Sequence, residues 1–129
     1  MLDAAKRAAD DIVSTAQDLA VDLAVNGDLH AGQVLAATRE PWLVVDPVLY
    51  RGDIEYDLAR VLWTRIDEMA DDAEIGRHFE DLVGFAQLDE GRARAWVVFR
   101  TVDYWLWAQE AGLTEDPRRC ARLLAAIKA

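Results

Sequence analysis

Apolar residues recur every three or four positions along most of this chain, and that period is interrupted in one stretch, residues 25–53. The first periodic segment, from Leu2 to Ala24, predicts an amphipathic helix. Asn26-Gly27 ends it, because these residues favour turns. Further periodic segments predict helices at Ile54–Met69, at about Glu74–Leu88, from Asp89 to Glu110, and from Asp116 to near Lys128.

Residues with known end preferences mark the boundaries of these helices. Asp53 and Asp89 precede two of them, and a short carboxylate before a helix can accept hydrogen bonds from its first free N–H groups. Gly112 follows Glu110, as expected where a helix ends in a left-handed residue. Asp116-Pro117 suits the start of the last helix, since proline needs no N–H partner in the first turn.

The interrupted stretch contains two short apolar or β-branched runs, Gln33–Ala37 and Trp42–Asp46. Pro41 lies in the connection between them, where its missing N–H costs nothing, so the pair predicts a β-hairpin. Residues 46–52 are expected to be irregular. The expected fold class is mainly α (α+β): one domain over residues 1–129, helical, with one small hairpin.

Composition indicates the structural class of the protein and the cellular compartment in which we expect it. Of the 129 residues, 53% are apolar and 29% are charged, which is typical of a globular chain. No apolar run approaches the ~20 residues that span a bilayer, and the N-terminus lacks the apolar core of a signal peptide. Cys120 is the single cysteine, so a small core residue in a reducing compartment is the simpler interpretation. We expect a cytoplasmic protein without membrane association.

The formal net charge of −10 excludes partners more firmly than it identifies one. It repels nucleic-acid phosphates and anionic lipid surfaces and attracts small cations. A surface that only maintains solubility explains the same charge.

Asp28, Gln33 and Asp46 form the chemical pattern of the interrupted stretch. Phosphoryl transfer needs a carboxylate that takes the acceptor's proton, and a carboxylate and an amide that bind metal ions. A loop followed by a hairpin can bring such groups together. Asp–x4–Gln alone is a weak signal, but its combination with strand, turn, strand and aspartate is stronger.

The segment "GDLHAGQVL…EPWLVVDPVLYRGDIEYDLA" resembles the catalytic core of the aminoglycoside phosphotransferases. It is most similar to the streptomycin 6-phosphotransferase and hydroxyurea phosphotransferase branch, with its pattern HGDLHxGNVL and WLxIDPKxxxGDPxYDxA. The motif covers residues 26–59, and the later helices match by pattern and tryptophan content. The resemblance implies a kinase-like C-terminal lobe, ATP and Mg²⁺ as cofactors, and transfer of the γ-phosphate to an alcohol group of a small cationic aminosugar or another acceptor.

The resemblance also implies residue roles. Asp28 matches the catalytic aspartate, Asp46 the metal-binding aspartate, and Asp57 the aspartate that hydrogen-bonds the catalytic-loop backbone. His30 is at a family position that organises the loop. Asp53 is at a family position too, but helix capping explains it, and we interpret it as structural.

Four positions depart from the family pattern. Asn26 replaces a histidine and is expected to support the loop by hydrogen bonding. Gln33 replaces the metal-binding asparagine, and its amide oxygen is about 1.5 Å further from the backbone. Mg²⁺ tolerates little error in its octahedral shell, so this change weakens the expected second ion site. Val48 and Ile54 replace a lysine and a proline.

The aromatic segment from Trp96 to Trp107 corresponds to the family's acceptor-binding region. Phe99, Val102 and Leu106 are spaced as a core stripe, which explains most of this segment. Asp103, Trp107 and Glu110 lie on an adjoining face and are candidates for binding a cationic aminosugar through carboxylates and ring stacking.

A kinase-like phosphotransferase also covers ATP with a lobe that carries a Gly-rich loop and a strand lysine. No Gly-rich loop is found in residues 1–129. Lys6 and Lys128 are the only lysines, and both are on predicted helices, so no strand lysine is expected either. We therefore expect the C-terminal lobe without the ATP-covering lobe, and little kinase activity from residues 1–129 alone. The alternative is a non-catalytic binding or interaction module, with self-association through the face that the missing lobe leaves open.

Overall fold

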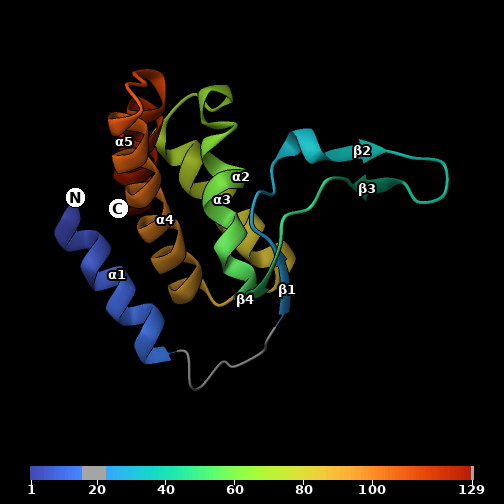
Figure 1. The fold of residues 1–129 in the computed structure, drawn as a ribbon, viewed down its shortest axis with the longest axis horizontal. Helices are drawn as coiled ribbons and strands as arrows, with labels where there is room; N and C mark the ends of the chain where they lie inside the picture. Colours follow the sequence, from blue (N-terminus) through green and yellow to red (C-terminus); the bar gives the residue numbers. More distant parts are fainter. Residues whose placement is uncertain (16–22, 129) are drawn as a thin grey trace.

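The computed structural model describes residues 1–15 and 23–128 (Figure 1). This part contains five α-helices, four short strands and three 3₁₀ turns. The helices are α1 (Leu2–Thr15), α2 (Leu58–Trp63), α3 (Asp72–Ala86), α4 (Glu90–Glu110) and α5 (Glu115–Lys128). The strands are β1 (Leu23–Asn26), β2 (Val34–Ala36), β3 (Trp42–Val44) and β4 (Leu49–Gly52), and the 3₁₀ turns are η1 (Ala31–Gln33), η2 (Ile54–Asp57) and η3 (Ile66–Glu68).

The long helix α4 lies at the centre of the helical body, with α1, α2 and α5 packed against it and α3 packed against α5. The largest fully buried side chains come from α2, η3, α3, α4 and α5, and they include Leu62, Ile66, Phe79, Val97 and Leu123. Burying one such side chain stabilises the fold by about 1.5–3 kcal/mol. The expected mainly helical α+β class is confirmed, and no helix within residues 1–15 and 23–128 could cross a bilayer.

Two of the predicted helix ends are confirmed by their hydrogen bonds and backbone. The Asp89 carboxylate accepts from the backbone N–H of Arg92 at 2.7 Å and caps α4. Gly112, with φ of 75°, follows the end of that helix in the left-handed region that glycine adopts without strain. Asp71 caps α3 in the same way through the N–H of Glu74, at 2.8 Å, so α3 begins slightly earlier than expected.

The prediction for residues 2–24 is wrong at its end. Residues 16–22 lie outside the described part, but Leu23 and Ala24 belong to strand β1. This strand pairs antiparallel with β4, placing Val25 opposite Tyr50, so the expectation of irregular chain up to Gly52 is also wrong. Val25 is 4% exposed, and the pairing turns this residue into the core.

The continuous helix expected over Ile54–Met69 is replaced by η2, α2 and η3. Arg65 has a φ of −116°, far from the helical value, and separates α2 from η3. The Thr64 hydroxyl donates to the Arg60 carbonyl at 2.8 Å, a local bond that competes with continued helix.

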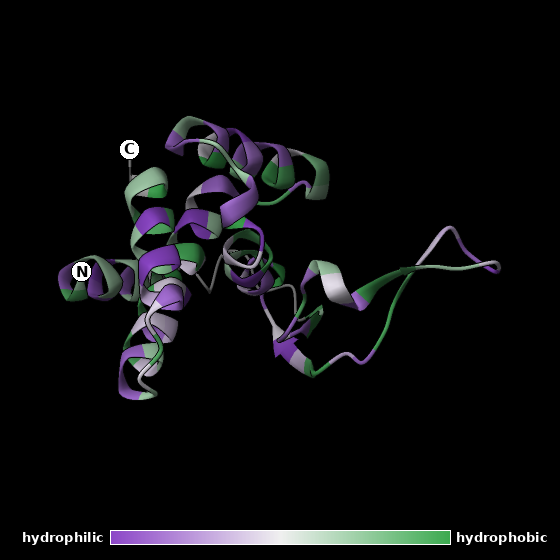
Figure 2. Ribbon diagram, turned by 90° about the horizontal axis from the view of Figure 1, so that it is seen from above, coloured by the Kyte–Doolittle hydropathy of each residue, from purple (hydrophilic) through white to green (hydrophobic). Residues whose placement is uncertain are grey.

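The predicted hairpin is present and is shorter than expected. β2 and β3 pair antiparallel with Val34 opposite Val44 and Ala36 opposite Trp42. We call residues 34–44 the hairpin arm, because they extend away from the helical body in both views (Figures 1 and 2). Apolar residues follow both of its strands in Figure 2, and Trp42 is 67% exposed.

Candidate active site

The loop after β1 is organised by Asn26, the last residue of that strand. Its Oδ1 accepts from the N–H of Asp28 at 3.2 Å and from the N–H of Val48 at 3.3 Å. Its Nδ2 donates to Oε1 of Gln33 at 2.9 Å. One side chain thus connects the loop that carries Asp28 to the turn that follows Asp46.

Gln33 is the second connection between these segments. It is 6% exposed, and its Nε2 donates to the backbone carbonyl of Asp46 at 3.1 Å. Its own carbonyl accepts from the N–H of Val45 at 2.9 Å, and its N–H donates to the carbonyl of His30 at 2.9 Å. Asp46, with φ of 51°, adopts the left-handed region that non-glycine residues rarely occupy.

The loop itself is compact. Nδ1 of His30 accepts from the N–H of Gly32 at 3.2 Å, at the start of η1. A Cβ atom on Gly27 would lie 2.1 Å from the Tyr50 ring, so a larger residue at this position would require that ring to move. The N–H of Gly27 donates to the carbonyl of Val48 at 2.8 Å, which fixes the loop against the same turn.

Asp57 contacts the loop through the backbone of Asn26. Its Oδ2 accepts from the backbone N–H of Asn26 at 3.0 Å, the kind of contact that the resemblance implies. Its Oδ1 is buried and has no hydrogen-bond partner within the described residues. Burial raises the pKa of Asp57 to about 6, with the nearby Asp28 adding to the rise and the Asn26 N–H and Arg100 opposing it.

Asp28 has a partner that the sequence reasoning missed. The guanidinium of Arg60 forms an ion pair with the Asp28 carboxylate through Nε and Oδ1, although the Nε–H does not point along a hydrogen-bond direction. Arg60 follows Asp57 by three residues at the start of α2, so both side chains reach the loop from one helix face. The spacing Asp–x–x–Arg after the loop motif was the available signal.

The interpretation of Asp53 as a helix cap is wrong. Asp53 precedes η2, but its side chain makes no capping hydrogen bond. Its Oδ2 instead forms an ion pair with Arg92 and accepts from Nε1 of Trp96 at 2.8 Å. Arg92 is 6% exposed, and a buried guanidinium without a charged partner is strongly destabilising, which explains why the Asp53 carboxylate pairs with it.

The three candidate acceptor residues, Asp103, Trp107 and Glu110, are all exposed on α4. Trp107 stacks on Tyr104 with ring centroids 5.4 Å apart, and Tyr104 stacks on the buried Trp63 at 4.6 Å. Burial raises the pKa of Tyr104, whose hydroxyl also donates to Asp116 at 3.0 Å. Trp107 therefore ends an aromatic stack that begins in the core, and the acceptor role of this face stays a prediction.

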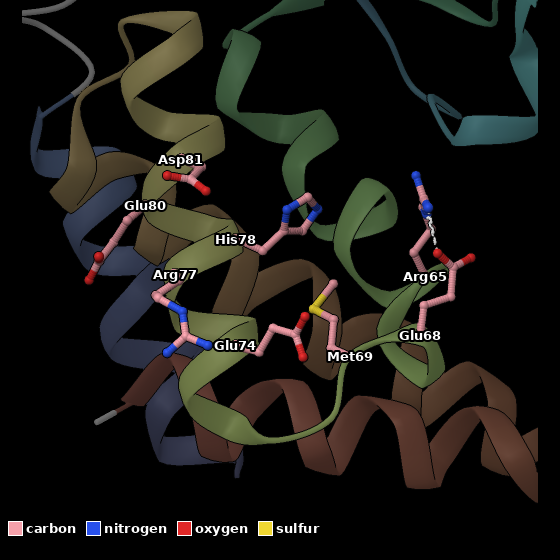
Figure 3. A pocket seen from close by; sticks show the side chains of 8 residues that line it. All are labelled: Arg65, Glu68, Met69, Glu74, Arg77, His78, Glu80 and Asp81. Atoms are coloured by element: carbon pink, nitrogen blue, oxygen red, sulfur yellow. Dashed lines mark hydrogen bonds and ion pairs between the residues drawn. The ribbon is translucent and has the colours of Figure 1, made fainter.

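The hollow drawn in Figure 3 lies apart from all these residues, between η3 and α3. Its volume is about 590 Å³, and Glu68, Glu74 and His78 are among its lining residues. The carboxylate of Glu68 pairs with Arg65, and Glu74 accepts from the N–H of Ala70 at 2.6 Å. Two acidic side chains of the hollow thus already have partners, and none of the predicted site residues lines it.

The metal-binding expectation can be tested against the donors in the loop. Asp46 has an exposed carboxylate suited to a cation. The Gln33 oxygen is buried and accepts a hydrogen bond from Asn26, so it is less accessible to a cation than the Asp46 carboxylate. No group of three or more His, Cys, Asp or Glu side chains in the described part of the chain is placed to hold a metal ion. The Asp46 carboxylate is thus the more accessible of the two predicted ligands, and the ligand roles of Asp46 and Gln33 stay predictions.

These features define a helical domain with a carboxylate-bearing loop held between two small antiparallel sheets. The family model described as aminoglycoside/hydroxyurea antibiotic resistance kinase matches residues 1–112. The chain belongs to this family, as the resemblance predicted.

Named relatives agree with this placement. The chain is 41% identical over 97 residues to a streptomycin 6-kinase of Streptomyces griseus, an alignment that covers 72% of this chain and 32% of that protein. It is 40% identical over 98 residues to a hydroxyurea phosphotransferase of Kitasatospora aureofaciens, covering 76% and 28%. A streptomycin 6-kinase of Streptomyces glaucescens is 38% identical over 95 residues, covering 70% and 31%. The matched segment thus spans about a third of the length of these relatives, and no solved structure matches the chain.

Proposed function

We propose that this chain is the catalytic-loop segment of a small-molecule O-phosphotransferase that takes ATP, carried with Mg²⁺, as its donor. Its acceptor is an alcohol group on a cationic aminosugar of the streptomycin type. The sequence identity to streptomycin 6-kinases supports this substrate class. The acidic net charge of −10 favours a cationic acceptor over an anionic one.

Asp28 is the proposed general base. Its carboxylate accepts the proton of the acceptor hydroxyl while that oxygen attacks the γ-phosphorus of ATP. The bond from the γ-phosphorus to the bridging oxygen breaks, and ADP leaves. The ion pair with Arg60 engages Oδ1, and the carboxylate has a second oxygen for the acceptor.

One observation carries the proposal most directly: the Asp28 loop is held at several independent points. Asn26, at the end of β1, accepts from the Asp28 N–H, Asp57 accepts from the Asn26 N–H, and Arg60 pairs with the Asp28 carboxylate. Proton transfer requires a base fixed within hydrogen-bond reach of its partner, and such a constrained loop meets that need.

A chimaera tests the proposal. The matching segment of the Streptomyces griseus streptomycin 6-kinase is replaced by residues 1–112 of this chain, and ADP release with streptomycin is measured. Turnover that falls by a factor of 10³ or more on Asp28→Asn supports the proposal, since general-base catalysis contributes about 10²–10⁴-fold. Asp81→Asn, which changes an exposed carboxylate on α3 outside the loop, is the matched control for kcat. A folded chimaera without turnover, or equal turnover in Asp28→Asn, contradicts it.

For residues 1–129 alone we expect weak ATP binding and no measurable phosphorylation, because the chain has no Gly-rich loop or strand lysine to grip phosphates. Calorimetric titration with streptomycin at low and moderate salt is expected to show weak, salt-sensitive binding. Tight ATP binding by this chain contradicts that expectation.

The hairpin arm favours a second candidate function, a non-catalytic interaction module that self-associates. Apolar side chains are exposed along the arm and at the start of β4, among them Leu35, Trp42 and Leu49. Exposed apolar surface of this kind promotes association. Sedimentation of wild type against Trp42→Ser tests this candidate: a dimer that the substitution dissociates supports it, and a monomer at all concentrations contradicts it.

A further inference from the structure

We infer that Gln33 serves this loop as a positioning residue and not as a metal ligand. With Asn26 it forms an amide pair that holds the Asp46 backbone, and a divalent cation at this loop is then bound by the Asp46 carboxylate without the Gln33 oxygen. The inference rests on the site assignment in the proposed function, but its test needs no catalysis.

The amide oxygen and the amide nitrogen of Gln33 each form a hydrogen bond. Its oxygen accepts from Asn26 at 2.9 Å, and its nitrogen donates to the Asp46 carbonyl at 3.1 Å. The side chain is 6% exposed, so water does not readily replace either bond. The oxygen has a second lone pair, but a hydrated metal ion has little access to a side chain that is 6% exposed and already bonded to Asn26.

The pair also explains how two departures from the family pattern coexist. Position 26 carries a shorter side chain than the histidine of the pattern, and position 33 carries a longer one than its asparagine. Asn26 offers two acceptor lone pairs and two donor hydrogens, and it uses both kinds at once, toward Asp28, Val48 and Gln33. The longer amide of Gln33 reaches both Asn26 and Asp46, so the two substitutions complement each other.

The backbone of Asp46 is the part that most needs support. Its φ of 51° is unfavourable for a residue with a Cβ atom. Gln33 contacts this region twice, through its side-chain nitrogen on Asp46 and its main-chain oxygen on Val45. Gln33 therefore holds the backbone from which the Asp46 carboxylate extends.

Gln33→Glu separates a ligand from a positioning residue. A carboxylate at a ligand position adds charge to the site and tightens cation binding. At a positioning residue, the same change places a carboxylate oxygen against the Asp46 carbonyl and removes a donor. Residues 1–129 are titrated with Mn²⁺ and followed by electron paramagnetic resonance, and unfolding is measured by circular dichroism.

We expect Gln33→Glu to bind Mn²⁺ no more tightly than wild type, with an unfolding midpoint lower by about 5 °C. Gln109→Glu, an exposed position on α4, makes the same charge change and controls for long-range attraction. Asp46→Asn is expected to weaken any Mn²⁺ binding at least tenfold. Binding tightened tenfold or more in Gln33→Glu, with an unchanged midpoint, overturns the inference.

A measurement on the wild-type chain does not depend on a folded variant. The side-chain amide protons of Asn26 and Gln33 are observed by nuclear magnetic resonance with and without saturating Mg²⁺. Unchanged chemical shifts and slow exchange for both amides support the amide pair. A Mg²⁺-dependent shift of the Gln33 amide with faster exchange of the Asn26 amide overturns it. Activity lost in the chimaera with the amide pair intact would count against the proposed function alone.

Discussion

Arg60 forms an ion pair with Asp28 from the first turn of α2, and Asp57, the residue directly before that helix, accepts from the Asn26 backbone N–H. The start of one short helix therefore reaches two neighbouring points of a loop about thirty residues earlier in the chain. Helix and loop are fixed relative to each other by these two contacts. The direction of the proposed base consequently depends on residues that the acceptor need not touch.

The Arg60–Asp28 pair is expected to be measurable and modest. Both side chains are partly exposed, and pairs of this kind contribute about 0.2–1 kcal/mol. A double-mutant cycle with Arg60→Ala and Asp28→Ala, followed by urea unfolding, should give a coupling free energy in that range. The exposed Arg65–Glu68 pair is the matched control and should give the smaller value. Strictly additive costs for Arg60 and Asp28 would contradict the pairing in solution.

Asp57 should make the free energy of unfolding depend on pH between its pKa in the unfolded chain and its pKa in the folded chain. Its pKa is about 6 in the folded chain, above the ordinary value of 3.8 for an aspartate, so the folded state binds more protons between these two pH values. Its contribution to stability is then fully present below about pH 3.8 and is lost as the pH rises through about 6. Urea unfolding over this range should show the decline in wild type and a smaller one in Asp57→Asn.

Two substitutions at Asp57 test whether its carboxylate holds the loop. Asparagine keeps an oxygen that can accept from the Asn26 N–H, whereas alanine does not. Hydrogen exchange at the Asn26 amide should therefore accelerate in Asp57→Ala more than in Asp57→Asn. Equal exchange in both variants would mean that Asp57 does not hold the loop.

Asp53→Ala should be among the most destabilising single substitutions. It leaves the buried Arg92 without its carboxylate and Trp96 without its acceptor. Removing one partner of a buried pair costs about 3–5 kcal/mol, a large part of the 5–15 kcal/mol that typical domains have. Asp71→Ala removes a helix cap and should cost about 1 kcal/mol. Similar losses for both in urea unfolding would restore the capping interpretation of Asp53.

Cys120 should be chemically inert in the folded chain. The residue is fully buried, and burial raises the pKa of its thiol to about 12, so the reactive thiolate is scarce at neutral pH. Ellman's reagent at pH 8 should therefore label it slowly in buffer and rapidly in guanidinium. Rapid labelling in buffer would show that α5 opens readily.

The helical part of the fold could be predicted because its signals are local. α3, α4 and α5 each have an apolar period and a recognisable boundary, such as Asp89 before α4 or Gly112 after it. The sheet of β1 and β4 could not be predicted this way. Leu49–Gly52 is a strand because Leu23–Asn26 lies beside it, and neither four-residue segment shows its partner in its own sequence.

The site was predicted at the level of residue types and not at the level of contacts. Motif spacing indicated Asp28, Gln33 and Asp46, but it could not show that Asn26 and Gln33 bond to each other. Arg60 was missed because an arginine on a helix face is usually solvated. Asp53 was misinterpreted because its partner, Arg92, is thirty-nine positions away along the chain.

The packing of α1 against α4 has a consequence for how this chain acquires its fold. The apolar face of the first helix is covered by a helix that begins at Glu90, so their contacts have high sequence separation. During synthesis at about 5–20 residues per second, roughly 4 to 15 s would pass between the end of α1 and the start of α4. Such long-range docking slows folding and leaves apolar surface available to chaperones in the meantime. Moving α1 to follow α5 by circular permutation would shorten that wait, and the gain should appear as a faster refolding rate.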